Sequence, residues 1–137
     1  MYKLSQIEEM VDIINKDLGL SENDLPAYGF DYGNRNSYIT VNKDGYSLIA
    51  FGHYRNKENQ RLLIKTLDIN ELLFEIFKAA TRQEAVKYEL EHRIQNQDTR
   101  ITYFNKHVEI LDSLALEKKF VQKLREYYDY LLQPRSA

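Results

Sequence analysis

Hydrophobic residues recur at helical spacing near the start of the chain. Each member lies three or four positions from another one, which places them all on one face of a helix. They are Ile7, Met10, Val11, Ile14 and Leu18. Gly19 follows them, and helices commonly end at a glycine because it adopts positive φ without strain. The pattern predicts an amphipathic helix that ends near Leu18, followed by a loop over residues 21–37.

Three short segments after this loop are rich in β-branched and aromatic residues, as strands are. They are residues 38–41 (YITV), 46–54 (YSLIAFGHY) and 61–67 (RLLIKTL). The turn sequence NKDG separates the first two and is typical of a β-hairpin. We therefore expect an antiparallel sheet of about three strands.

Helical periodicity dominates the rest of the chain. All five glycines lie within residues 19–52, and neither glycine nor proline occurs over residues 53–133. Because both residues disfavour helix interiors, their absence favours helices in this half. We predict helices over about 68–80, 82–114 and 117–132, and a frayed tail over 133–137. The pair Thr81 and Glu84 has the spacing of a capping box and predicts the break between the first two helices. In the second helix we expect Leu90 and Ile94 to face inward.

The predicted fold class is therefore α+β, with a small antiparallel sheet of about three strands and four to five helices. A length of 137 residues fits one domain, which we expect to span residues 1–137. No run of about eighteen apolar residues occurs, so no segment is expected to cross a membrane. The chain has no cysteine, which fits a reducing cytoplasm.

Charge is unevenly distributed along the chain. Residues 1–34 have a balance of −5, and the remaining residues have a balance of +3. A nucleic-acid-binding module usually needs a concentrated basic face, so this distribution argues against one. It favours instead an acidic first helix, with Glu8 and Asp12, that meets a basic protein.

An aromatic loop follows the first helix. Its sequence, AYGFDYGNRNSY over residues 27–38, alternates four aromatic rings with glycine, asparagine and arginine. Rigid rings on an adaptable polar backbone are typical of protein-recognition loops. Alternatively, some of the rings cover the edge of the core. The candidate partner-binding residues are Glu8, Asp12, Tyr28, Tyr32, Arg35, Tyr38, Tyr54, Arg55 and Glu58.

The segment over residues 87–104 concentrates charged side chains. Glu89 and His92 have the spacing of a di-iron ligand pair, but such a site needs a second pair of this kind, and the sequence has none. The alternative to a metal site is a structural ionic network of Glu89, Arg93, Asp98 and Arg100. Glu89 and Arg93 stand one helical turn apart and are expected to pair. Asp98 and Arg100 are too close in sequence to pair along one helix.

Two alternatives to a binding protein stay open. One is a small metal-binding or hydrolytic enzyme that uses Glu89, His92 and Asp98, with His53 as a further candidate. The other is an adaptor module that associates with itself through tyrosines. No cofactor or metal is expected, because no phosphate loop or nucleophile with an oriented base is evident. His107 is expected to be a partly exposed helix residue.

Several spaced blocks of the chain resemble immunity protein family sixty-three of bacterial polymorphic toxin systems. The blocks comprise Thr66, Asp68, Glu71, Leu72, Leu73 and Phe74, then Tyr88, Glu89, Leu90 and Arg93, then Asp98, Arg100 and Phe104. The resemblance implies an α+β protein that binds and neutralises a cognate protein toxin made by its own cell, without catalytic activity. We expect a cytoplasmic protein that blocks this toxin by occlusion. The charge distribution argues against a nucleic-acid partner, no membrane partner is expected, and the oligomeric state stays open.

Overall fold

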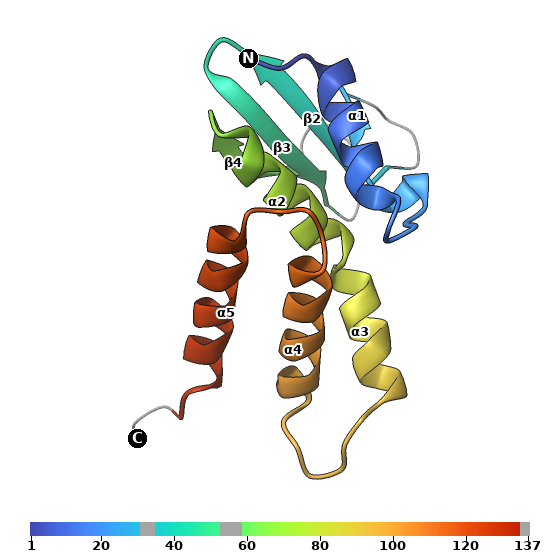
Figure 1. Ribbon diagram of the computed structural model, residues 1–137, viewed down its shortest axis with the longest axis vertical. Coiled ribbons are helices and arrows are strands. Elements are labelled where there is room, and N and C mark those ends of the chain that lie inside the picture. Colours follow the sequence, from blue (N-terminus) through green and yellow to red (C-terminus); the bar gives the residue numbers. More distant parts are fainter. Residues whose placement is uncertain (31–34, 53–58, 135–137) are drawn as a thin grey trace. The chain divides into compact units, whose positions relative to one another are not determined.

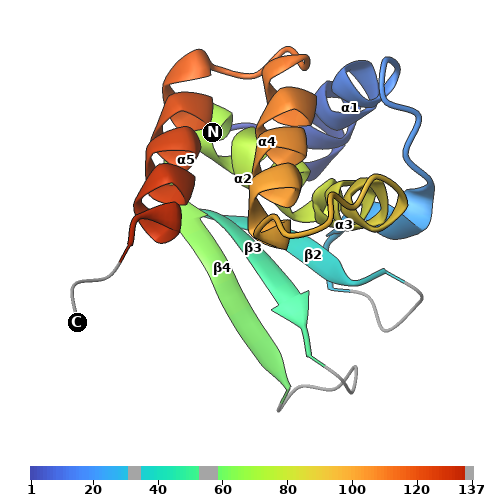
Figure 2. The ribbon, with the colours of Figure 1, turned by 90° about the horizontal axis from the view of Figure 1, so that it is seen from below.

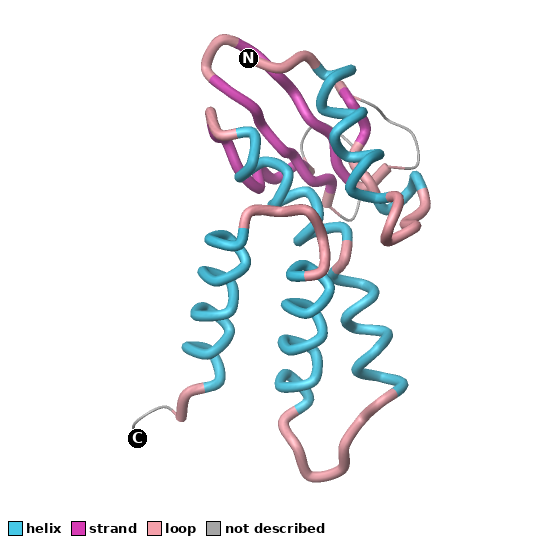
Figure 3. The backbone as a smooth tube through the Cα atoms, viewed as in Figure 1, coloured by secondary structure: helices cyan, strands magenta, loops and turns pink. Residues whose placement is uncertain are grey.

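The computed structural model describes residues 1–30, 35–52 and 59–134. This part forms a four-stranded sheet and five α-helices, and the C-terminal half is helical, so the predicted α+β class is confirmed (Figures 1 and 3). The chain divides into two compact units, Met1–Ala80 and Thr81–Ala137, which are described separately. That residues 1–137 make one domain stays a prediction.

The first unit contains the sheet. Its elements are α1 (Leu4–Asn15), a 3₁₀ turn (Glu22–Asp24), β1 (Ala27–Tyr28), β2 (Ser37–Asn42), β3 (Gly45–Phe51), β4 (Gln60–Thr66) and α2 (Ile69–Ala80). The strands are ordered β1-β2-β3-β4, with β1 parallel to β2 and the other pairs antiparallel. The three predicted strands are present, and β1 is an addition within the predicted loop.

One face of this sheet carries the core of the first unit. Ile39 lies opposite Leu48, and Leu48 lies opposite Ile64, so the three side chains share a face. Helices α1 and α2 both lie on one face (Figures 1 and 2). A β-bulge between Leu48 and Ile49 shifts the register, so Leu62 pairs with Ile49 and points to the opposite face. Ile39 and Leu48 are fully buried, whereas Leu62 is exposed. The helices therefore cover the Ile39 face, as the apolar stripe of the first helix predicts.

The second unit consists of α3 (Arg82–Glu91), α4 (Thr99–Asp112) and α5 (Lys118–Leu132). Helix α4 packs against both α3 and α5. The prediction of one helix over 82–114 is wrong, because the chain leaves the helix at His92. Asn96 adopts a φ of 66°, and the Asp98 carboxylate accepts a hydrogen bond from the Arg100 amide, which caps α4. Leu90 and Ile94 are consequently exposed rather than inward-facing.

A buried histidine joins the three helices of the second unit. His107 on α4 is 1% exposed, so the prediction of a partly exposed side chain is wrong. Its Nδ1 lies 2.7 Å from the Tyr128 hydroxyl on α5, and its Nε2 lies 3.1 Å from the Thr81 hydroxyl. The Thr81 side chain makes no capping hydrogen bond to α3. A neutral imidazole satisfies both contacts when Tyr128 donates to Nδ1 and Nε2–H donates to Thr81.

The β2–β3 hairpin predicts a position-specific effect of added side chains. Gly45 has a φ of +134°, and a Cβ there would lie 2.7 Å from the Thr66 carbonyl oxygen. We expect Gly45→Ala to lower the free energy of unfolding by about 2–4 kcal/mol. Gly19→Ala is the matched control, since its φ is +71° and nothing lies within 4 Å of the added atom. It should cost only about 1 kcal/mol in urea denaturation, and equal losses would contradict the packing argument.

The buried histidine generates a second stability prediction. Tyr128→Phe removes the hydroxyl that pairs with His107 and leaves a buried ring nitrogen without that contact. We expect a loss of about 1–3 kcal/mol in the free energy of unfolding. Tyr130→Phe is the control, because Tyr130 is exposed on the same helix and should change stability little. Indistinguishable denaturation midpoints for the two variants would show that the contact contributes nothing.

Candidate functional site

Four of the predicted partner-binding residues gather around β1. Glu8 and Asp12 are exposed on α1, which packs on β1. Burial, followed by the charges of Asp12 and Glu8, raises the pKa of Tyr28 far above its usual value, and Arg35 opposes this shift. The Tyr28 hydroxyl is buried and finds no hydrogen-bond partner among the residues that the structure describes. The two carboxylates, the phenol and the guanidinium are therefore electrostatic neighbours, and we call Glu8, Asp12, Tyr28 and Arg35 the α1–β1 surface.

Arg35 holds the backbone next to this surface through hydrogen bonds to two carbonyl groups. Its Nη1 donates to the Pro26 carbonyl at 2.9 Å and reaches the Leu25 carbonyl at 3.4 Å. Its Nη2 lies 3.7 Å from the Glu22 carboxylate, which is exposed. The guanidinium thus holds the segment that leads into β1, and most of its side chain is covered.

The aromatic rings divide into buried and accessible ones. Tyr38 is 7% exposed, and its hydroxyl lies 2.7 Å from Gln60 Oε1. Phe30 packs edge-on against it, with ring centroids 5.1 Å apart, and is 43% exposed. Tyr38 therefore offers little surface, and Phe30, which was not among the candidate residues, is the most exposed of the loop's rings that the structure describes. The predicted contacts Tyr32, Tyr54, Arg55 and Glu58 lie outside the described residues.

The charged segment of the second unit forms two separate ion pairs. Glu89 is 6% exposed, and its carboxylate accepts from Arg93 Nη2 at 2.7 Å and Nε at 3.2 Å. These hydrogen bonds raise the pKa of Arg93. Arg100 Nη2 lies 2.7 Å from Asp98 Oδ2, although the two residues are too close in sequence to meet along one helix. They meet because Asp98 precedes the helix as its N-cap. The hydrogen bonds from Arg100 lower the pKa of Asp98.

The residues of the metal-site alternative do not converge. His92 Nδ1–H donates to the Tyr88 carbonyl at 2.9 Å, and its ring stacks on that of Tyr88. Glu89 and Asp98 are each occupied by an arginine. Across residues 1–30, 35–52 and 59–134, no group of three potential ligands could hold a metal ion. His53 lies outside these ranges.

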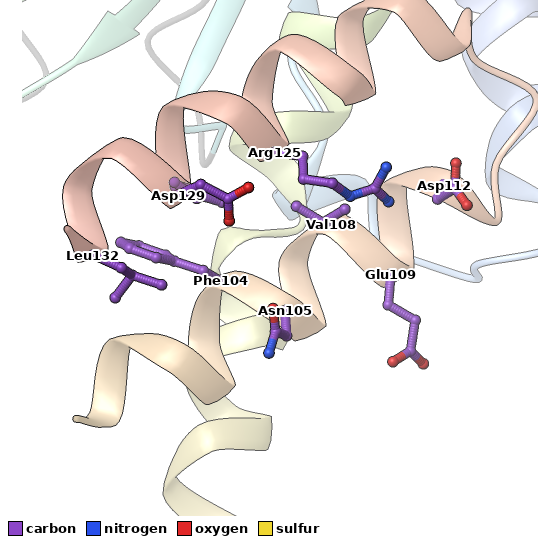
Figure 4. Close-up of a pocket in the computed structure, with 9 residues that line it drawn as sticks. Phe104, Asn105, Val108, Glu109, Asp112, Arg125, Asp129 and Leu132 are labelled. Atoms are coloured by element: carbon purple, nitrogen blue, oxygen red, sulfur yellow. The ribbon is translucent and has the colours of Figure 1, made fainter. Parts of the chain in front are cut away.

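A groove of about 350 Å³ separates α4 from α5. Three carboxylates line it, and Figure 4 shows them spread along the groove rather than directed at one point. Glu109 pairs with Lys106 and Asp112 pairs with Lys118. The groove residues are Phe104, Asn105, Val108, Glu109, Asp112, Arg125, Tyr128, Asp129 and Leu132. This arrangement assembles no pair of carboxylates for acid–base catalysis.

The sequence model of the family described as Immunity protein 63 matches residues 45–129, which is more than half of the chain. The chain belongs to this family. Comparisons with curated proteins and with solved structures gave no match. Membership in the Immunity protein 63 family supports an immunity function, and a protein toxin is the general class of partner that it implies.

The Immunity protein 63 match begins at β3 and ends within α5. The α1–β1 surface lies before it, whereas the helices of the second unit lie largely within it. No helix of the described residues has both the length and the apolar character needed to cross a bilayer.

The division of the aromatic rings predicts different stability effects. Tyr38→Ala removes a buried ring and its contact with Gln60, so we expect a loss of about 3–5 kcal/mol in the free energy of unfolding. Phe30→Ala removes a half-exposed ring and should cost about 1 kcal/mol. Chemical denaturation of both variants checks the ranking. A larger loss for Phe30→Ala would mean that Phe30 belongs to the core.

Proposed function

We propose that this member of the Immunity protein 63 family binds the cognate toxin of its own cell and neutralises it by covering a functional surface of the toxin, without catalysis. Family membership carries the proposal. The α1–β1 surface supports it, because exposed carboxylates stand there beside aromatic rings. The protein acts in the cytoplasm of a bacterium whose polymorphic toxin system supplies the partner.

Charge and aromatic area contribute to different steps of binding. Exposed carboxylates on α1 attract a basic surface at a distance of about a Debye length, which raises the association rate. Phe30, Tyr28 and the rings that support them supply apolar contact area once the partners touch, and such anchors slow dissociation. The acidic helix therefore sets the rate of capture, and the rings set the lifetime of the complex.

Co-expression with the toxin encoded beside this chain tests the function directly. We expect the chain to restore growth and to form a complex with the toxin that survives size-exclusion chromatography. Growth arrest without any complex would overturn the proposed function.

The acidic helix generates a kinetic prediction. Glu8→Lys and Asp12→Lys should each lower the association rate with the toxin several-fold at low salt, with the effect fading as salt rises. Asp44→Lys is the matched control, since it makes the same charge change at an exposed site in the β2–β3 turn. Surface plasmon resonance measures the rates. If Asp44→Lys slows association as much as Glu8→Lys does, net charge matters and the α1–β1 surface does not.

A further inference from the structure

Two large aliphatic side chains of the second unit lie in solvent. Leu90, near the end of α3, is 62% exposed, and Ile94, in the turn after it, is 55% exposed. Single exposed aliphatic residues are ordinary on protein surfaces, so exposure alone indicates nothing. These two are four residues apart, and Leu90 also forms the edge of a hollow. The exposure of Leu90 is therefore part of a larger surface feature, and Ile94 follows directly after Arg93, which also lines the hollow.

The hollow lies between α3 and α4 and has a volume of about 290 Å³. Val86, Leu90 and Tyr103 form apolar walls, and Glu89, Arg93, Thr99 and Arg100 supply the polar lining. Pockets for small molecules usually occupy about 300–1,000 Å³ and enclose most of the ligand. This hollow is smaller and is open to solvent, which suits a single large side chain presented by another protein.

Both arginines of the hollow are held in place before any partner arrives. Arg93 uses Nε and Nη2 to bind Glu89, and Arg100 uses Nε and Nη2 to bind Asp98. Arg100 Nη1 also reaches the Leu131 carbonyl at 3.3 Å. Groups that are already ordered lose little conformational entropy on binding. The two guanidinium groups are therefore ready-made contacts.

The polar groups of the hollow specify the partner's chemistry. Its two arginines are each paired with a carboxylate, Glu89 and Asp98, so what the hollow offers is unused N–H donors and not a net positive charge. Arg93 Nη1 donates to no acceptor within the described residues, whereas both oxygens of Glu89 are already bonded to Arg93. A guanidinium with unused N–H donors beside an apolar wall favours a carboxylate next to a large apolar side chain.

We propose that the hollow between α3 and α4 is a second contact site for the toxin, which inserts one large apolar side chain there and places a neighbouring carboxylate against Arg93. This inference rests on the proposed function and deepens it. A second copy of the chain is the alternative occupant, and the test below distinguishes it from the toxin.

The test measures the affinity of the purified full-length chain for the purified toxin by calorimetry. Leu90→Ser and Ile94→Ser should leave the denaturation midpoint unchanged and should together weaken binding at least 10-fold. Arg93→Lys keeps a cation beside Glu89 but removes the guanidinium, and it should weaken binding about 3-fold or more. Leu67→Ser is the matched control, because Leu67 is an exposed leucine of the first unit, and it should bind as the wild type does.

The outcomes separate this inference from the proposed function. If the wild type binds the toxin and the double variant binds within 2-fold of it, the contact site is overturned while the proposed function stands. If the wild type fails to bind at all, the proposed function falls, and the inference falls with it. Light scattering of the free chain adds a third outcome: a dimer that Leu90→Ser dissociates would assign the hollow to a second copy and would overturn the toxin as its occupant.

Discussion

The ion pair between Glu89 and Arg93 is the constraint on which the shape of the second unit depends. A buried carboxylate loses its hydration and needs a cation within hydrogen-bond distance, and Arg93 supplies two hydrogen bonds to it. Helix α3 ends at Glu91, yet Arg93 must still reach back to Glu89, so the chain stays close to the end of the helix for two further residues. Along this path Ile94 lies in solvent, and Arg93 lines the hollow beside α4 together with Leu90 of α3. The Glu89–Arg93 pair therefore stabilises a buried carboxylate and also exposes guanidinium N–H donors at the surface.

The sequence predicted helices and strands best where a helical or strand-like repeat of hydrophobic residues extended over several residues. The stripe on the first helix and the β-branched runs predicted α1, β2, β3 and β4, whereas β1 has only two residues and carries no period that could reveal it. The break between α3 and α4 was missed because no glycine or proline marks it. Asn96 at positive φ and Asp98 as a cap are weaker signals of the same event. The burial of His107 could have been predicted from its position, because it lies on the same helical stripe as Phe104, Val108 and Leu111. Its polar side chain favoured the opposite expectation.

The candidate site was predictable in composition but not in geometry. An acidic first helix and an aromatic loop were evident from the residues, and the structure brings Glu8, Asp12, Tyr28 and Arg35 together. Which ring is accessible could not be deduced, because alternation within the loop does not distinguish Phe30 from Tyr38. The two rings differ in exposure because Tyr38 lies within β2, which pairs with strands on both sides, whereas Phe30 lies beyond the end of β1. Likewise, Asp98 and Arg100 could not pair if both lay inside one helix, but they do pair because Asp98 is the N-cap of α4.

The two surfaces differ in electrostatic character, and this affects which partner fits both. The α1–β1 surface is acidic, whereas the hollow of the second unit offers guanidinium donors beside apolar walls. Each arginine of the hollow is already paired with a carboxylate, so the hollow acts through its unused N–H donors and not through a net charge. A partner that uses both surfaces must carry a basic region for the first and a carboxylate next to an apolar anchor for the second. Exposed charges act before contact and are screened by salt, whereas a side chain in a hollow acts only after contact and is screened little. Association and dissociation of one complex should therefore depend on different units of this chain.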